Sequence, residues 1–140
     1  MQERSWNSAE VKFFKLDFEK AMRCLEEYAR RIVERGAIAV ILIGSLARGD
    51  YTAFSDADLI IVSDNVPDDP LERLRDFMDP TLPIDLEPRV YTRKEFLEMA
   101  RDERRIIGEV LKYGILLAGD RALIIEAKKL YFKASPKNNY

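Results

Sequence analysis

The chain has 140 residues, a typical length for one domain, and 47% of them are apolar, which excludes an intrinsically disordered protein. A net charge of −2 gives no general attraction to nucleic acid, so direct nucleic-acid binding is not expected. The absence of histidine and the single cysteine, Cys24, exclude an internal disulfide, a typical structural zinc site and the nucleophilic dyads that depend on histidine.

The start of the chain and its apolar runs bear on location. The segment MQERSWNSAE at the start is polar and lacks the apolar core of a signal peptide. No apolar run approaches the length that spans a membrane. We therefore expect a cytoplasmic protein without membrane contacts. We also expect a single domain over residues 1–140, with polar termini at about 1–7 and 135–140.

A long helix is predicted in the first quarter of the chain. From Val11 onward, apolar residues recur at helical spacing and form one stripe, with charged residues on the opposite side. Ser8 is placed to cap the start of this helix, and Gly36 is placed to end it. The pattern allows a break near residues 16–17, and residues 1–7 are expected to form a loose terminus.

Two apolar segments around a polar motif predict the centre of a sheet. Residues 37–43 (AIAVILI) are almost wholly apolar and predict a strand that is buried on both faces. Residues 56–63 (DADLIIVS) predict the second strand, which has aspartates at its first and third positions. Between the strands, Ser45 is placed to cap a short helical turn over residues 46–50, and residues 51–55 are expected to form a loop.

The second half of the chain alternates further strands with helices. Asp69 and Pro70 fit the cap and first position of a helix that continues to about residue 79, with Leu71, Leu74, Phe77 and Met78 directed inward. Thr92 and Glu95 form a capping box for a helix that continues to about Tyr113. The remaining predicted elements are strands over residues 84–87 and 115–118 and a last helix over about 121–133. This order predicts an α/β (α+β) domain with a small mixed β-sheet flanked by helices.

The chemistry of the chain is concentrated in the stretch GSLARGDYTAFSDADL, from Gly44 to Leu59. A Gly-Ser turn after a buried strand brings backbone N–H groups close to a phosphate. Asp56 and Asp58 are two residues apart, so on a strand their carboxylates face the same side and can share a hard divalent cation. Without histidine or a pair of thiols, a metal here needs oxygen ligands, which favours magnesium, manganese or calcium.

A third carboxylate lies on the predicted strand over residues 84–87. Asp85 is placed to complete a metal site with Asp56 and Asp58, or to act on an attacking hydroxyl. Glu87 shares its face and is an alternative to Asp85. For each of these carboxylates, a solvated position at the end of a strand is the competing interpretation.

Taken together, these residues resemble the nucleotidyltransferase superfamily descended from DNA polymerase β, and among its members the minimal nucleotidyltransferases (MNT). The family pattern is GSxARG, a variable spacer and SDxDL, with the third carboxylate on a later strand. The positions that match are Gly44, Ser45, Ala47, Arg48, Gly49, Ser55, Asp56, Asp58 and Leu59. Motif support covers roughly residues 37–92.

The resemblance implies a nucleotidyltransferase fold and a division of roles within the site. Gly44, Ser45, Arg48 and Ser55 are implied to bind the nucleotide. Asp56, Asp58 and Asp85 are the implied catalytic and metal-binding residues. They would hold Mg²⁺, in one or two positions, with Mn²⁺ as a possible substitute, and ATP would be the substrate.

The resemblance also implies a partner. Stand-alone MNT proteins are typically paired with a separate HEPN toxin, and some transfer AMP from ATP to a tyrosine of that toxin. We therefore expect a nucleotidyltransferase that acts as the antitoxin of such a pair. The alternatives are a non-catalytic toxin-binding module with a vestigial nucleotide site, and a small-molecule nucleotidyltransferase of the aminoglycoside-modifying kind. The acceptor, the base preference, the strand order and the formation of an oligomer stay open.

Overall fold

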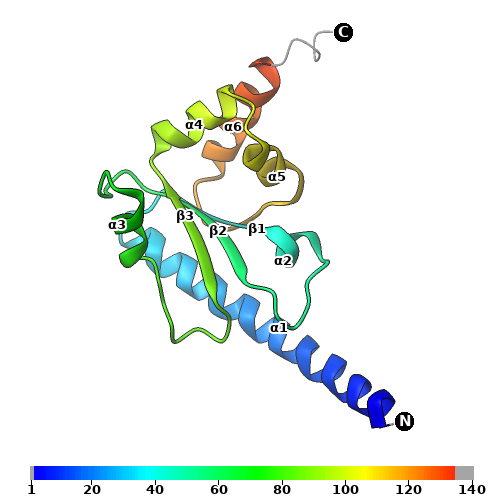
Figure 1. Ribbon diagram of the computed structural model, residues 1–140. Helices are drawn as coiled ribbons and strands as arrows, with labels where there is room; N and C mark the ends of the chain where they lie inside the picture. Colours follow the sequence, from blue (N-terminus) through cyan, green and yellow to red (C-terminus); the bar gives the residue numbers. More distant parts are fainter. Residues whose placement is uncertain (1, 135–140) are drawn as a thin grey trace.

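The computed structural model describes the backbone of residues 2–134 and the side chains of residues 18–133. Figure 1 shows helices on both sides of a small central sheet. The elements in chain order are α1 (Gln2–Glu34), β1 (Ala39–Ile43), α2 (Gly44–Arg48), β2 (Ala57–Val62), α3 (Pro70–Arg75), β3 (Leu86–Tyr91), α4 (Arg93–Arg101), α5 (Arg105–Tyr113), β4 (Ile115–Gly119) and α6 (Arg121–Ala134).

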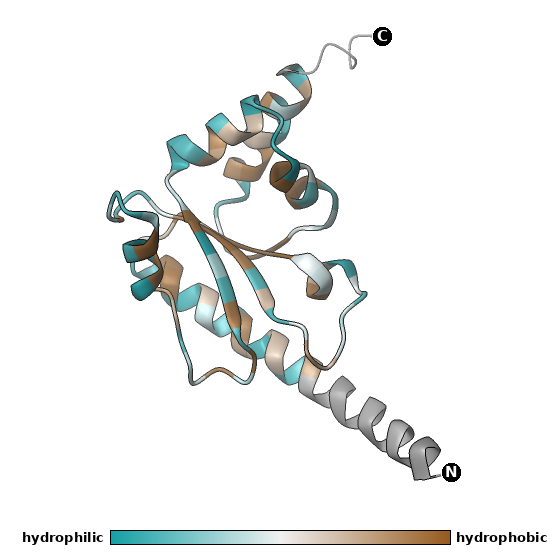
Figure 2. Cartoon of the chain, in the orientation of Figure 1, coloured by the Kyte–Doolittle hydropathy of each residue, from teal (hydrophilic) through white to brown (hydrophobic). Residues whose placement is uncertain are grey.

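The sheet is mixed and has the strand order β3-β2-β1-β4. β1 runs antiparallel to both β2 and β4, whereas β2 and β3 are parallel. Every residue of β1 is buried, because this wholly apolar strand lies inside the sheet and is covered on both faces. Figure 2 shows the apolar character of β1 along its length. The predicted fold class is confirmed.

Alternate residues of the central strands face two separate apolar cores. Leu42 and Ile61 pack in the core on the side of α1, together with Leu25 of that helix. Their neighbours Ile41 and Ile60 pack in the core on the opposite side, which α4, α5 and α6 complete. Residues two apart on a strand share a face of the sheet. Asp58 therefore faces the α5 side, as Ile60 does.

The first helix differs from its prediction. It begins at Gln2 and continues without interruption through residues 16–17. Ser8 therefore lies inside the helix and does not cap it, and the expected loose terminus is wrong for residues 2–7. No glycine or proline occurs before Gly36, so nothing in the local sequence stops the helix from extending toward the N-terminus. The predicted polar tail at residues 135–140 lies outside the described residues.

The α3 region also differs from its prediction. Asp69 caps the helix and Pro70 follows it, as expected, but α3 ends at Arg75 rather than near residue 79. Leu71 is 77% exposed and Met78 is 49% exposed, so the expectation that both point inward is wrong. The buried side chain of α3 is Arg73, which the apolar pattern does not indicate.

Two elements predicted after α3, a strand and a helix, also have different bounds in the structure. β3 covers Leu86–Tyr91 instead of the predicted residues 84–87, so Asp85 lies just before the strand rather than within it. The strand continues past Pro88 because an edge strand tolerates proline. The single helix predicted after Thr92 is divided into α4 and α5 by a turn in which Glu103 has a φ of 55°. No glycine or proline marks this turn in the sequence RDERR. Among the described residues, no helix is both long and apolar enough to cross a membrane.

Candidate active site

The Gly-Ser turn and the first two aspartates meet at one end of the sheet. β1 ends at Ile43, whose antiparallel partner on β2 is Asp58. Gly44 follows with a φ of 77°, and a Cβ atom built on it would lie 2.2 Å from Oδ2 of Asp58. Glycine is therefore required at this position for two reasons: the backbone is left-handed, and the Asp58 carboxylate approaches it closely.

The two serines of the motif are joined across the loop that separates α2 from β2. The hydroxyl groups of Ser45 and Ser55 are 3.0 Å apart and hydrogen-bonded. Ser55 Oγ also accepts a hydrogen bond from the backbone N–H of Thr52, at 2.8 Å. The N-cap position of α2 is Ile43, with no side-chain cap, so the predicted capping role of Ser45 is wrong. Instead, both hydroxyls lie together near the turn.

The loop between α2 and β2 is also attached to α1. The rings of Phe18 and Tyr51 stack with their centroids 4.4 Å apart and nearly parallel planes. This contact holds Tyr51, and with it the start of the loop, against α1. Phe54, in the same loop, is 90% exposed. The attached loop fixes the path of the chain between the Gly-Ser turn and the aspartates.

The predicted nucleotide-binding groups Gly44 and Arg48 converge on one carboxylate, that of Glu109 in α5. The backbone N–H of Gly44 donates to Oε2 of Glu109 at 2.8 Å. Arg48 Nη1 donates to the same oxygen at 2.9 Å. Arg48 Nε also pairs with Asp50 Oδ2, at 3.4 Å. Nothing in the sequence indicated Glu109 as a site residue, because its contacts with Gly44 and Arg48 arise only from the packing of α5 beside the turn.

The carboxylates of β2 and β3 are neighbours because these strands are parallel and in register. Asp58 pairs directly with Glu87 on β3. The backbone N–H of Ala57 donates to the carbonyl of Asp85 at 2.8 Å, which places Asp85 beside the start of β2. Ala57 itself is fully buried. The structure thus brings Asp56, Asp58, Asp85 and Glu87 to the same end of the sheet.

Mutual repulsion marks this group of carboxylates. Partial burial raises the pKa of Asp56, and the nearby charges of Glu87 and Asp85 raise it further. Hydrogen bonding to Asp58, together with its charge, raises the pKa of Glu87. Glu87 is therefore close enough to both aspartates to act on them, and Asp85 is close enough to act on Asp56. Glu87 is itself exposed, as expected for a solvated side chain.

The donor chemistry of these residues is suited to a hard cation. All of them offer carboxylate oxygens, the ligands that Mg²⁺ and Mn²⁺ prefer, and a divalent cation would relieve their repulsion. Among the residues that the structure describes, no three histidine, cysteine or acidic side chains are arranged so that they could hold a metal ion together.

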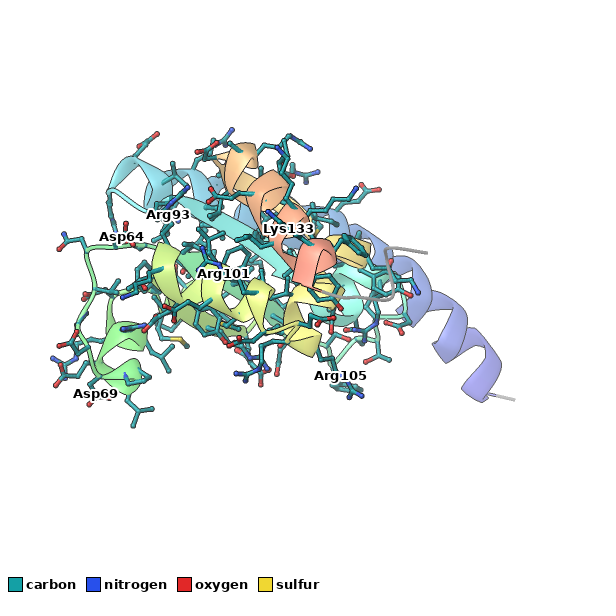
Figure 3. All side chains as sticks on the ribbon, turned by 90° about the horizontal axis from the view of Figure 1, so that it is seen from above. Asp64, Asp69, Arg93, Arg101, Arg105 and Lys133 are labelled. Carbon is teal, nitrogen blue, oxygen red and sulfur yellow. The ribbon has the colours of Figure 1, made fainter. Side chains whose placement is uncertain are left out.

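A cleft of about 350 Å³ lies beside the turn and the aspartates. One wall is formed by α5, and Figure 3 labels Arg105 at the start of that helix. The charged residues that line the cleft are three arginines, Arg48, Arg89 and Arg105, and two acids, Asp58 and Glu109. Nothing in the sequence indicated Arg89 and Arg105 as site residues either. Arg89 is a single arginine on a strand, and Arg105 belongs to the charged segment RDERR, which has the pattern of a solvated helix surface.

The model of the nucleotidyltransferase domain family matches residues 23–117. The chain belongs to this family. A curated relative of this nucleotidyltransferase-domain chain is the bifunctional uridylyltransferase/uridylyl-removing enzyme of Methylococcus capsulatus. The two are 36% identical over 104 residues, which cover 71% of this chain and 12% of the relative. The chain thus spans only a small part of that enzyme's length.

Solved structures give the same fold. A toxin–antitoxin structure with AMP-PNP aligns with a TM-score of 0.54 and 14% identity, covering 81% of this chain and 92% of the other. A mutant of the toxin–antitoxin MntA-HpeT aligns with a TM-score of 0.55 and 13% identity, covering 84% and 92%. At such identities the likeness concerns the fold. The family and the fold predicted from the motif are both confirmed.

Proposed function

We propose that this nucleotidyltransferase-domain chain transfers AMP from ATP, with Mg²⁺, to a protein hydroxyl group, namely a tyrosine of a separate HEPN-type toxin, and so acts as an antitoxin. The observation that carries the proposal is the contact between the Gly44 turn and the Asp58 carboxylate. It places the turn that we propose to bind phosphate directly beside Asp58, one of the two aspartates that we propose to bind the cation. The fold shared with toxin–antitoxin structures, one of them solved with AMP-PNP, supports the choice of nucleotide and partner.

The nucleotide-binding half of the proposal rests on donors that already converge. Gly44 N–H and the Arg48 guanidinium both donate to a single anionic oxygen, and a phosphate oxygen makes the same demands. The adjacent hydroxyls of Ser45 and Ser55 add donors beside the turn. Arg89 and Arg105 line the same cleft and add positive charge for a triphosphate.

Asp56 and Asp58 are the residues proposed to hold Mg²⁺, or Mn²⁺ in its place, with Asp85 or Glu87 as the third carboxylate. When bound, the ion supplies positive charge that neutralises the triphosphate and its pyrophosphate leaving group. The acceptor hydroxyl oxygen bonds to the α-phosphorus while the bond to pyrophosphate breaks. The hydroxyl proton passes to Asp85, which lies exposed at the edge of the site.

One observation favours UTP as a second candidate nucleotide. The relative that is 36% identical over 104 residues is a uridylyltransferase. Both nucleotides share the triphosphate that the turn and the arginines would bind, so the two candidates differ only at the base. Assays of this chain should therefore compare ATP with UTP.

Transfer of a labelled nucleotide is the direct test. The chain is incubated with Mg²⁺, α-labelled ATP or UTP, and a HEPN protein shown to bind it. We expect AMP to label a tyrosine of the HEPN protein. A double variant, Asp56→Asn with Asp58→Asn, should lose the transfer, whereas Asp68→Asn, in the loop before α3, should retain it. No label with either nucleotide, despite a confirmed complex, would refute the catalytic proposal.

The same variants distinguish transfer from simple covering of the toxin. If the double variant still neutralises the toxin as well as wild type, then covering is sufficient for the antitoxin effect. If neutralisation disappears with transfer, the covalent modification is responsible. Mass measurement of the HEPN protein separates AMP from UMP attachment.

A further inference from the structure

Glu109 occupies the position in which the Gly44 turn and Arg48 would receive an anion. One of its oxygens, Oε2, accepts hydrogen bonds from Gly44 N at 2.8 Å and from Arg48 Nη1 at 2.9 Å. The contact joins α5 to the turn across 65 residues of sequence. Two donors on one anionic oxygen are what a phosphate oxygen requires.

The position of Glu109 within its helix also distinguishes it. It is the only acidic residue of α5, whose sequence is RIIGEVLKY. The next residue, Val110, is buried in the core, whereas 29% of the Glu109 side chain is exposed, in the cleft. Its carboxylate therefore has its polar partners in the candidate site and access to solvent from the cleft.

We propose that Glu109 is an internal competitor for the nucleotide phosphates, and hence a determinant of nucleotide affinity at this site; the inference rests on the function proposed above. Binding of a triphosphate at Gly44 and Arg48 requires the Glu109 carboxylate to leave. The observed association constant is then the intrinsic association constant multiplied by the fraction of molecules in which the turn is free of Glu109.

The cleft offers the released carboxylate another partner. Arg105 precedes Glu109 by four residues on α5, so the two side chains lie on the same face of the helix, and both line the cleft. A carboxylate that leaves Gly44 can therefore pair with Arg105 without any movement of the helix backbone. Exchange of Glu109 for phosphate also removes a negative charge from the immediate surroundings of the triphosphate.

The test measures binding to the whole chain by calorimetry, with Mg²⁺ and two probes, AMP-PNP and inorganic triphosphate. Glu109→Gln keeps the size of the side chain and removes its charge, and Glu109→Ala removes the competing group altogether. Both variants should bind each probe about tenfold more tightly than wild type. Asp50→Asn removes another charge beside Arg48 but leaves Gly44 covered, and should change affinity by about twofold or less.

The outcomes separate this inference from the proposed function. Wild-type binding of AMP-PNP with equal or weaker binding by both Glu109 variants overturns the competitor role and leaves the nucleotide site standing. Absence of binding to wild type and variants alike overturns both. A crystal structure of the wild-type chain with AMP-PNP gives a second test that needs no variant: Glu109 should have left Gly44 N–H, and a nucleotide bound while this contact persists contradicts the inference.

Discussion

At the scale of single residues, the site depends on Gly44 because the backbone there must be left-handed and must also approach Asp58 closely. Spacing in the sequence was enough to single out Gly44, Asp56 and Asp58 as candidates, because Gly44 follows an apolar strand and the two aspartates lie two residues apart at the start of the next. Glu109 could not be found in this way. It reaches Gly44 only through the packing of α5 on β1, and its own segment has the pattern of a core helix.

Replacement of Gly44 by alanine tests both requirements. Gly49 is a matched control, because its φ is 93° and no atom lies within 4 Å of a Cβ atom built there. Gly49→Ala should lower the free energy of unfolding by about 1–2 kcal/mol through backbone strain alone. Gly44→Ala should lower it by at least about 1 kcal/mol more, because the methyl group also displaces Asp58. Urea denaturation measures both, and equal losses would contradict the close contact.

At the scale of elements, the long apolar patterns predicted the helices and strands, whereas tertiary contacts decided where they end. Arg73 is an example. Arg73 is only 5% exposed, and its guanidinium donates to Val90 O at 3.1 Å and to both oxygens of Glu95, at 2.6 and 3.2 Å. Glu95 also completes the capping box at the start of α4. One arginine thus joins α3, β3 and α4, and the apolar pattern of α3 cannot reveal such a connection.

Removal of Arg73 should therefore cost more than removal of an exposed ion pair. Arg73→Ala is expected to lower the free energy of unfolding by about 2 kcal/mol, a value reduced because Glu95 is 43% exposed. Arg93 and Glu126 form a comparison pair at 2.5 Å in which both side chains are over 40% exposed. Arg93→Ala should cost about 0.5 kcal/mol. If chemical denaturation gives the same loss for both variants, the burial of Arg73 contributes nothing.

The interaction of Glu95 with Arg73 should also make the free energy of unfolding depend on pH. The hydrogen bond with Arg73 lowers the pKa of Glu95 below the ordinary value in the folded chain. A lowered folded pKa means that the stabilisation is present above the unfolded pKa and is lost as pH falls through the folded pKa. The difference in unfolding free energy between wild type and Glu95→Gln should therefore shrink between about pH 6 and pH 3. A difference that is constant over this range would contradict the assigned interaction.

At the scale of the whole molecule, the site lies where the sheet ends between two helical layers. α1 covers the face opposite to the carboxylates, while α5 stands on their side and leaves the cleft open. The sequence predicted the layers but left the strand order open, because no local pattern specifies that β1 lies between β2 and β4. The parallel pairing of β2 with β3 is what brings Asp85 and Glu87 beside Asp56 and Asp58.

The claim that the Gly44 turn, Asp56 and Asp58 form a single nucleotide site is tested most directly by the affinity of the chain for AMP-PNP, measured once with Mg²⁺ and once with a chelator in its place. For wild type we expect binding that weakens at least about tenfold when Mg²⁺ is removed. The Asp56→Asn, Asp58→Asn variant should already bind as weakly in Mg²⁺ as wild type does without it. An affinity that neither the chelator nor the double variant changes would contradict the claim.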